Sequence, residues 1–348
     1  FYSFTPQASG VYTVEVSPEG VRYMRMQRSD PRYYFFSSDE LIEVVQFGTV
    51  EWESMKDMFF LCKNMTFAAN IDTPDLTKVT DMSRMFAECE SFNQPLNNWD
   101  VSKVTDMREM FKECRAFNQP LNNWNVSNVT DMSGMFGDCD RFNQPLNHWN
   151  VSNVTDMSRM FEGCDRFNQP LNNWNVSNVT NMSGMFGNWK IFEFSTFNQP
   201  LDNWDVSKVT DMSEMFYRCR AFNQPLNHWN VSQVTNMSGM FEDCSDFNQP
   251  LEKWNVGNVT GMSGMFAGCK SFNQPLEKWD VSKVTTMSGW VLGGLFVGMF
   301  KGCSVFNQPL NNWDVSKVTD MGGMFEGCKS FNQPLEKWDV SKVTTMSG

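Results

Sequence analysis

One short sequence recurs along this chain and limits what the chain can fold into. The pentapeptide FNQPL begins at ten places, separated by 25 residues in seven of the nine steps and by 30 and 34 residues in the other two. The ten starting residues are Phe92, Phe117, Phe142, Phe167, Phe197, Phe222, Phe247, Phe272, Phe306 and Phe331. A fixed period of this length is typical of a solenoid, in which each coil buries its apolar side chains only against its neighbours.

Eight apolar positions of the unit do not vary between the regular coils, whereas the two positions after each Met-Phe pair change freely. The residues from Trp99 to Met107 follow an extended pattern, and those from Met107 to Cys114 recur at helical spacing. In the first regular coil the eight positions are Phe92, Leu96, Trp99, Val101, Val104, Met107, Met110 and Phe111.

This spacing predicts three segments in each coil. We expect a proline-containing loop over Phe92–Asn98, a short strand within Trp99–Met107 and a helix of one to two turns over Arg108–Cys114. Ser83 and its equivalents follow the first Met in most coils and are placed to cap that helix. The predicted fold class is a repeat solenoid with one short parallel β-strand and a short helix per coil.

The start of the chain differs from the coils. Val11–Val16 and Val21–Met26 alternate apolar and polar residues around a Ser-Pro-Glu-Gly turn, which is a β-hairpin pattern. We therefore predict a small β cap over residues 1–44 and a solenoid of about twelve coils over residues 45–348. The sequence stops in the middle of a unit, so the last coil is expected to be open at its C-terminal end.

Some polar positions are as constant as the apolar ones. Asn93 and Gln94 recur in all ten copies, and we predict that they form a stacked amide ladder, with Thr105 and its equivalents in a similar role. Nine of the ten Cys lie three residues before the Phe of FNQPL, and Cys62 holds the matching place in a worn first coil. One Cys per coil predicts a buried small side chain rather than a disulfide, and no Cys-x-x-Cys spacing suggests zinc.

A second set of polar positions varies in a correlated way. Where the residue after Trp is Asp, as at Asp100, the residue three further on is Lys, as at Lys103, and where it is Asn the partner is Asn or Gln. Contact between the two places would explain this match, and so would duplication of two ancestral units. His148 and His228 occupy a place that otherwise holds Asn or Lys and are expected to be solvated. The predicted exposed polar face consists of Asp100, Lys103, His148, Asp205, Lys208, His228, Asp280 and Lys283.

Two coils break the period, through extra residues near 188–196 and near 290–298. Both insertions lie in or just after the predicted helix, so both should bulge from one side of the solenoid. Three interpretations stay open: contact with a partner, packing on neighbouring coils, and an irregularity of sequence assembly. The candidate partner contacts are Trp189, Ile191, Phe192, Phe194, Trp290, Val291, Leu292, Leu295 and Phe296.

Charge and motifs argue against several classes of function. A net charge of −12 and a pI near 4.7 disfavour nucleic-acid binding, which needs clustered Lys and Arg. No apolar run approaches the roughly 20 residues that cross a bilayer. The sequence has no Gly-rich phosphate loop, G-x-S-x-G, H-E-x-x-H or EF-hand loop. We therefore predict a protein that is not an enzyme, with no catalytic residue, metal or cofactor.

The unit FNQPLNNWDVSKVTDMSxMFxxC resembles the BspA-like surface-protein repeat, which is also found in mycoplasma lipoproteins, over roughly residues 41–348. Such repeats are regarded as relatives of leucine-rich repeats, and the spacing Leu96-x-x-Trp99-x-Val101 fits the strand of that repeat. The resemblance implies an extracellular, cell-surface or virion-surface location, and it carries no active site.

Two hypotheses of function follow. The first is a non-enzymatic surface repeat protein that binds a protein or glycan partner through its variable polar face. The second is a structural subunit of a virion, filament or other assembly, in which the open last coil and the two insertions contact other subunits.

Overall fold

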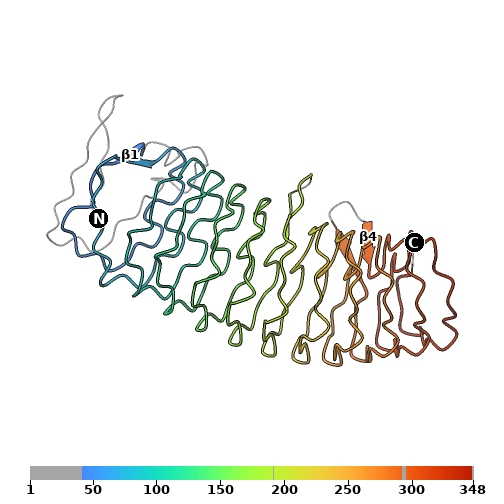
Figure 1. The fold of residues 1–348 in the computed structure, drawn as a ribbon. Helices are drawn as coiled ribbons and strands as arrows, with labels where there is room; N and C mark the ends of the chain where they lie inside the picture. The colour runs from blue at the N-terminus through green and yellow to red at the C-terminus, as the bar shows by residue number, and fades with distance from the viewer. Residues whose placement is uncertain (1–40, 191, 292–294, 347–348) are drawn as a thin grey trace.

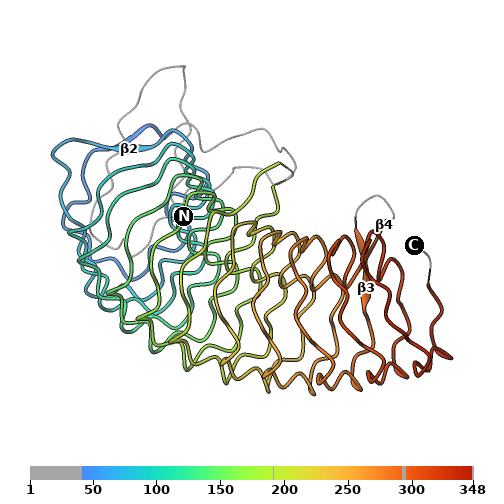
Figure 2. The same ribbon diagram turned by 45° about the vertical axis from the view of Figure 1, so that its right-hand side comes forward.

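The structure, a computed structural model, describes residues 41–190, 192–291 and 295–346. These residues wind into one elongated, gently curved stack of coils, with the first and last coils at opposite ends (Figure 1). A view turned by 45° shows the coils as loops that lie side by side along the stack (Figure 2). The predicted repeat architecture is confirmed. Of the predicted cap over residues 1–44, all but the last four residues lie outside the described part.

Regular strands are few among the described residues. β1 (Glu43–Val44) pairs in parallel with β2 (Thr66–Phe67), which lies one coil later. β3 (Ser288–Val291) pairs in antiparallel with β4 (Leu295–Gly298) as a hairpin. β1 thus begins the described stack, and the boundary between cap and solenoid at residue 44 stays a prediction.

In the regular coils the predicted strand is reduced to a single bridging residue. Asp106 forms parallel bridges with Asp81 in the preceding coil and with Asp131 in the following coil, and equivalent bridges continue along the stack. The backbone N–H and the hydroxyl of Thr105 both donate to the carbonyl oxygen of Thr80, at 2.9 and 3.2 Å. The strand lies where the sequence predicts it, but tight turns at 101–104 and 107–110 on either side shorten it to one bridging residue.

The predicted helix is wrong, since the described residues contain no α-helix. Glu109 and Glu113 have φ angles of 53° and 59°, a left-handed conformation that a right-handed helix excludes. The N–H of Glu109 donates to the carbonyl of Ser133 in the next coil, at 2.8 Å. The N–H of Met110 instead donates to the carbonyl of Met107, three residues back in its own turn, at 3.2 Å. Successive N–H groups therefore alternate between the neighbouring coil and the coil's own turns.

The residue that caps this turn also differs from the prediction. Asp81, rather than Ser83, supplies the accepting oxygen, because its Oδ1 accepts the backbone N–H of Ser83 at 2.8 Å and the Ser83 hydroxyl at 2.6 Å. In the next coil Arg108 replaces Ser, and its backbone N–H donates to Asp106 in the same way, at 3.0 Å. The cap therefore depends on the Asp or Asn that precedes the Met.

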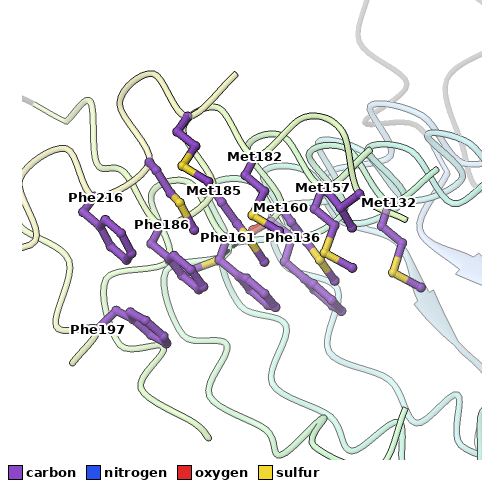
Figure 3. Packing of buried hydrophobic residues seen from close by; sticks show 14 of the residues in the cluster. Met132, Phe136, Met157, Met160, Phe161, Met182, Met185, Phe186, Phe197 and Phe216 are labelled. Carbon is purple, nitrogen blue, oxygen red and sulfur yellow. Dashed lines mark hydrogen bonds between the residues drawn. The ribbon is translucent and has the colours of Figure 1, made fainter. Parts of the chain in front are cut away.

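Two columns of stacked Phe rings form the centre of the stack. The ring of Phe111 lies 5.6 Å from that of Phe136 with the planes 6° apart, and Phe136 also stacks on Phe142 of the FNQPL loop at 4.1 Å. Figure 3 shows Phe136, Phe161 and Phe186 aligned in one column, with Met side chains beside them. Such pairs contribute about 0.5–1.5 kcal/mol each beyond the area they bury. The apolar positions predicted as core are buried in the regular coils.

Two polar atoms inside the core are satisfied by the preceding coil. The thiol of Cys139 donates to the carbonyl of Phe111 at 2.9 Å, and the indole N–H of Trp124 donates to the carbonyl of Leu96 at 2.9 Å. The predicted buried free thiols are confirmed for nine of the cysteines, and Cys328 in the last coil is half-buried. The same two donors recur in most coils, where they satisfy carbonyl groups buried in the core.

The predicted amide ladder is confirmed. Oδ1 of Asn118 accepts the backbone N–H of Asn143 at 3.0 Å and the side-chain Nε2 of Gln144 at 3.1 Å, both in the next coil. Gln144 Nε2 also donates to the Asn118 carbonyl, at 3.0 Å. The same bonds recur from coil to coil, so the constant amides hold the stack together.

Replacing Asn118 with Ala tests the ladder. Asn118→Ala leaves the backbone N–H of Asn143 without its acceptor and removes one of the two acceptors of Gln144 Nε2, so it should lower the free energy of unfolding by about 1–3 kcal/mol in chemical denaturation. The control is Asn123→Ala, at an exposed place that holds His or Lys in other coils, and it should change stability by less than about 0.5 kcal/mol. Equal effects of the two variants would rule out the ladder as a stabilising element.

Candidate interaction surface

The loop over 188–196, which breaks the period, is anchored through one lysine. The ammonium of Lys190 lies 2.6 Å from Oδ1 of Asp140 and 3.3 Å from Asp165, and it donates to the carbonyl of Gly163 at 2.8 Å. Asp140 and Asp165 belong to two preceding coils, so the loop leans back across both. The sequence analysis missed this anchor. Its signal is a Lys among apolar residues, with Asp at matching places of two preceding coils.

Lys190 faces an excess of carboxylates. Besides Asp140 and Asp165, Glu193 and Asp138 lie 3.4 and 3.9 Å from its ammonium. Burial opposes the charge of Lys190, but the hydrogen bond to Asp140 and the surrounding carboxylates outweigh it and raise its pKa. Burial, followed by the Glu193 carboxyl, raises the pKa of Asp165 to about 6. The loop therefore lies in a negative field that its one ammonium does not cancel.

The aromatic side chains of the loop divide into packed and exposed ones. Phe194 is half-buried, with the guanidinium of Arg220 3.1 Å from its ring centroid. Trp189 stacks on Tyr217 with ring centroids 4.5 Å apart, yet it remains 49% exposed, and Phe192 is 89% exposed. Packing on a neighbouring coil accounts for Phe194, whereas Phe192 lies in solvent, and its contact with a partner stays a prediction.

The second insertion is the β3–β4 hairpin. Its register pairs Ser288 with Gly298 at the base and Val291 with Leu295 toward the tip. The hairpin and the loop over 188–196 project from the same side of the stack, as predicted (Figures 1 and 2). Several predicted contacts lie partly or wholly outside the described residues. Only the backbone is described for Trp290, Val291, Leu295 and Phe296. Ile191 and Leu292 are not described at all.

The predicted polar face is exposed, but its contacts are not those expected. Oδ1 of Asp100 accepts the backbone N–H of Ser102 at 3.0 Å. Hydrogen bonds from Ser102 are the main cause that lowers the pKa of Asp100, and the charge of Lys103 lowers it least. No ion pair joins Asp100 to Lys103 in the described chain. Lys208 instead donates to Oδ1 of Asn178 in the preceding coil, at 2.6 Å. No direct ion pair therefore explains the match between Asp100 and Lys103, and duplication of two ancestral units stays a hypothesis. The exposed residues are Asp100, Lys103, His148, Asp205, Lys208, His228, Asp280 and Lys283.

The two histidines take part in the same kind of contact. Nε2 of His148 lies 2.9 Å from the carbonyl of Asn122, and His228 contacts the carbonyl of Asp202 in the same way. Both imidazoles remain exposed, so the prediction that they are solvated is confirmed.

Two shallow hollows lie on the described surface. The first has a volume of about 360 Å³ and is lined by residues that include Arg220, Asp243 and Lys270. The second has a volume of about 390 Å³ and is lined by residues that include Asn173 and Asp205. Both are lined mainly by polar side chains, unlike the apolar pockets that enclose small ligands.

No arrangement typical of catalysis stands out in the part of the chain that the structure describes. No three His, Cys, Asp or Glu side chains there are placed to hold a metal ion. Burial raises the pKa of the Cys219 thiol to about 12 and that of Cys328 to about 11, which makes both poor nucleophiles. Over the same residues, no helix is long and apolar enough to cross a bilayer. The absence of a catalytic residue, metal and cofactor stays a prediction.

Comparison with known proteins identifies the family. This is a repeat protein built from stacked coils, and a family model described as "Mycoplasma protein of unknown function, DUF285" matches residues 32–146, 121–196, 188–294 and 295–348. The chain belongs to this family, which confirms the resemblance to the mycoplasma repeat. No curated protein matches the chain.

Two similar solved structures have low scores. A leucine-rich cell surface protein from Faecalibacterium prausnitzii has 13% identity and a TM-score of 0.31, over 90% of this chain and 87% of that one. An internalin from Listeria monocytogenes has 9% identity and a TM-score of 0.25, over 85% of this chain and 87% of that one. At these scores neither likeness carries an argument about this chain, and the relationship to leucine-rich repeats stays a prediction.

Gly298, at the base of the hairpin, allows a close backbone approach. A Cβ placed there would lie 2.3 Å from the carbonyl carbon of Gly323 and 2.4 Å from Cα of Met324, both backbone atoms of the next coil. Gly298→Ala should therefore destabilise the fold by about 3 kcal/mol or more, measured by chemical denaturation. The control is Gly257→Ser, since Ser holds that place in the other nine copies, and it should be nearly neutral. A Gly298→Ala variant as stable as the wild type would contradict this packing of hairpin on coil.

Burial and the charges of Asp243 and Glu214 raise the pKa of Glu242 to about 8. Because the folded state favours its neutral form, the stabilisation is complete below the ordinary pKa near 4.5 and is lost as pH rises through about 8. The Tm of Glu242→Gln should therefore decrease less than that of the wild type when the pH is raised from 6 to 9. Glu336→Gln, at an exposed position, should keep the wild-type slope. Parallel pH profiles of the wild type and Glu242→Gln would refute this assignment.

Proposed function

We propose that this chain is a non-enzymatic repeat scaffold at the outer surface of a cell, which binds a protein or glycan partner. One observation supports it most. The chain buries the apolar residues of its repeat, yet Trp189 and Phe192, at a place where the repeat is broken, are 49% and 89% exposed. Large aromatic side chains that a fold leaves in water are typical of a contact surface.

The remaining support comes from the arrangement of the stack. Both insertions project from one side of the stack (Figure 1). The positions after each Met-Phe pair, where the first insertion also begins, vary freely between coils. A rigid stack that carries variable residues and loops on one side suits the binding of an extended partner. The surface location is inferred from the resemblance of the unit to surface-protein repeats.

Arrays of purified extracellular proteins and of glycans, incubated with the full chain, test this function. We expect binding to at least one array member at about micromolar affinity, a free energy near −8 kcal/mol, and a monomer in sedimentation experiments. A chain that binds neither array but assembles with increasing concentration would contradict the proposal and favour a structural subunit, in which the last coil makes the contacts.

A further inference from the structure

We propose that the loop over 188–196 docks a cationic, apolar segment of a partner protein, an inference that rests on the proposed function and specifies its partner. Phe192 provides the apolar contact. The carboxylates of Glu193 and Asp140 provide the charge for Lys or Arg side chains of that segment.

The base of the loop is held in place by hydrogen bonds to neighbouring coils. Asn188 is fully buried and donates through Nδ2 to Asp165 at 2.7 Å. The guanidinium of Arg218 donates to the Lys190 carbonyl at 2.6 Å, and the Thr196 hydroxyl donates to the Asp165 carbonyl at 2.8 Å. Binding to such a preorganised loop loses little of its free energy to ordering the loop.

The apolar part of the site is Phe192, and Trp189, three residues earlier in the same loop, is also 49% exposed. Phe192 is 89% exposed, while the Phe residues of the repeat, such as Phe186 and Phe197, are buried. Covering an exposed Phe contributes about 1.5–3 kcal/mol. An aromatic ring next to carboxylates also suits a Lys or Arg side chain, through contact of the cation with the ring face.

The charge around the loop selects the class of partner. Four carboxylates lie around the ammonium of Lys190, and two guanidinium groups also contact the loop, so negative groups outnumber positive ones by one. The carboxylates are those of Asp138, Asp140, Asp165 and Glu193, and the guanidinium groups are those of Arg218 and Arg220. An acidic glycan or an anionic lipid surface would be repelled. A neutral glycan can donate hydroxyl hydrogen bonds to the carboxylates but gains no charge attraction from them. The net charge of −12 adds a long-range attraction for a basic partner.

The test measures fluorescence anisotropy of labelled synthetic peptides with the full chain. One peptide alternates Leu and Lys, and two matched peptides alternate Leu with Glu and Ser with Lys. We expect the Leu/Lys peptide to bind at least about tenfold more tightly than the other two. Phe192→Ser and Glu193→Gln should each weaken it about threefold or more. Val305→Ser, which removes another exposed apolar side chain (43% exposed), should leave binding unchanged.

Equal affinity of the wild type and Phe192→Ser for the Leu/Lys peptide would overturn the proposal, and so would equal binding of the Ser/Lys peptide. Because Phe192 is exposed, Phe192→Ser should keep the wild-type Tm, which separates loss of binding from loss of fold. An array partner that Phe192→Ser still binds normally overturns the docking site and leaves the proposed function standing.

Discussion

The stack depends on how each coil divides its backbone hydrogen bonds between itself and its neighbour. The N–H of Glu113 donates to the carbonyl of Gly137 in the next coil at 2.6 Å, while the N–H of Lys112 donates to Glu109 within its own turn at 3.1 Å. Two left-handed residues per coil, one in each of its two tight turns, accompany this alternation. In an α-helix these backbone hydrogen bonds would all form within the segment, and in a β-strand they would all form with a neighbouring segment. Here each coil forms both kinds. A coil without a neighbour would therefore lose half of these bonds.

The alternation also restricts positions that look free in the sequence. The left-handed residue of one coil extends its side chain over the same place in the next, where Gly often leaves room. A Cβ on Gly134 would lie 3.1 Å from Cγ of Glu109, and one on Gly184 would lie 3.1 Å from Cγ of Arg159. The side chain of Glu or Arg in one coil thus favours Gly at the equivalent place in the next coil, because Gly leaves room for it.

The insertions show which part of this arrangement is dispensable. The ring columns continue past the loop over 188–196, with Phe186 and Phe216 5.8 Å apart, and past the hairpin, with Phe266 and Phe300 also 5.8 Å apart. Extra residues therefore leave the stack between two turns and return to it without breaking the core. Loops on a rigid scaffold are where binding residues usually lie, and here Lys190 ties such a loop to the coils beneath it.

The amino-acid sequence alone determined the period, the buried positions, the amide ladder and the side on which the insertions project, because each follows from comparing copies of one unit. Only the tertiary structure decided the conformation of the Met-to-Cys segment. Apolar residues such as Met107, Met110 and Cys114 recur at helical spacing, and two successive tight turns give the same spacing. In the sequence, the turns are indicated only by the Gly residues that several coils have at the left-handed positions. The anchoring of Lys190 was likewise beyond the sequence, since it joins residues 25 and 50 positions apart that only stacking brings together.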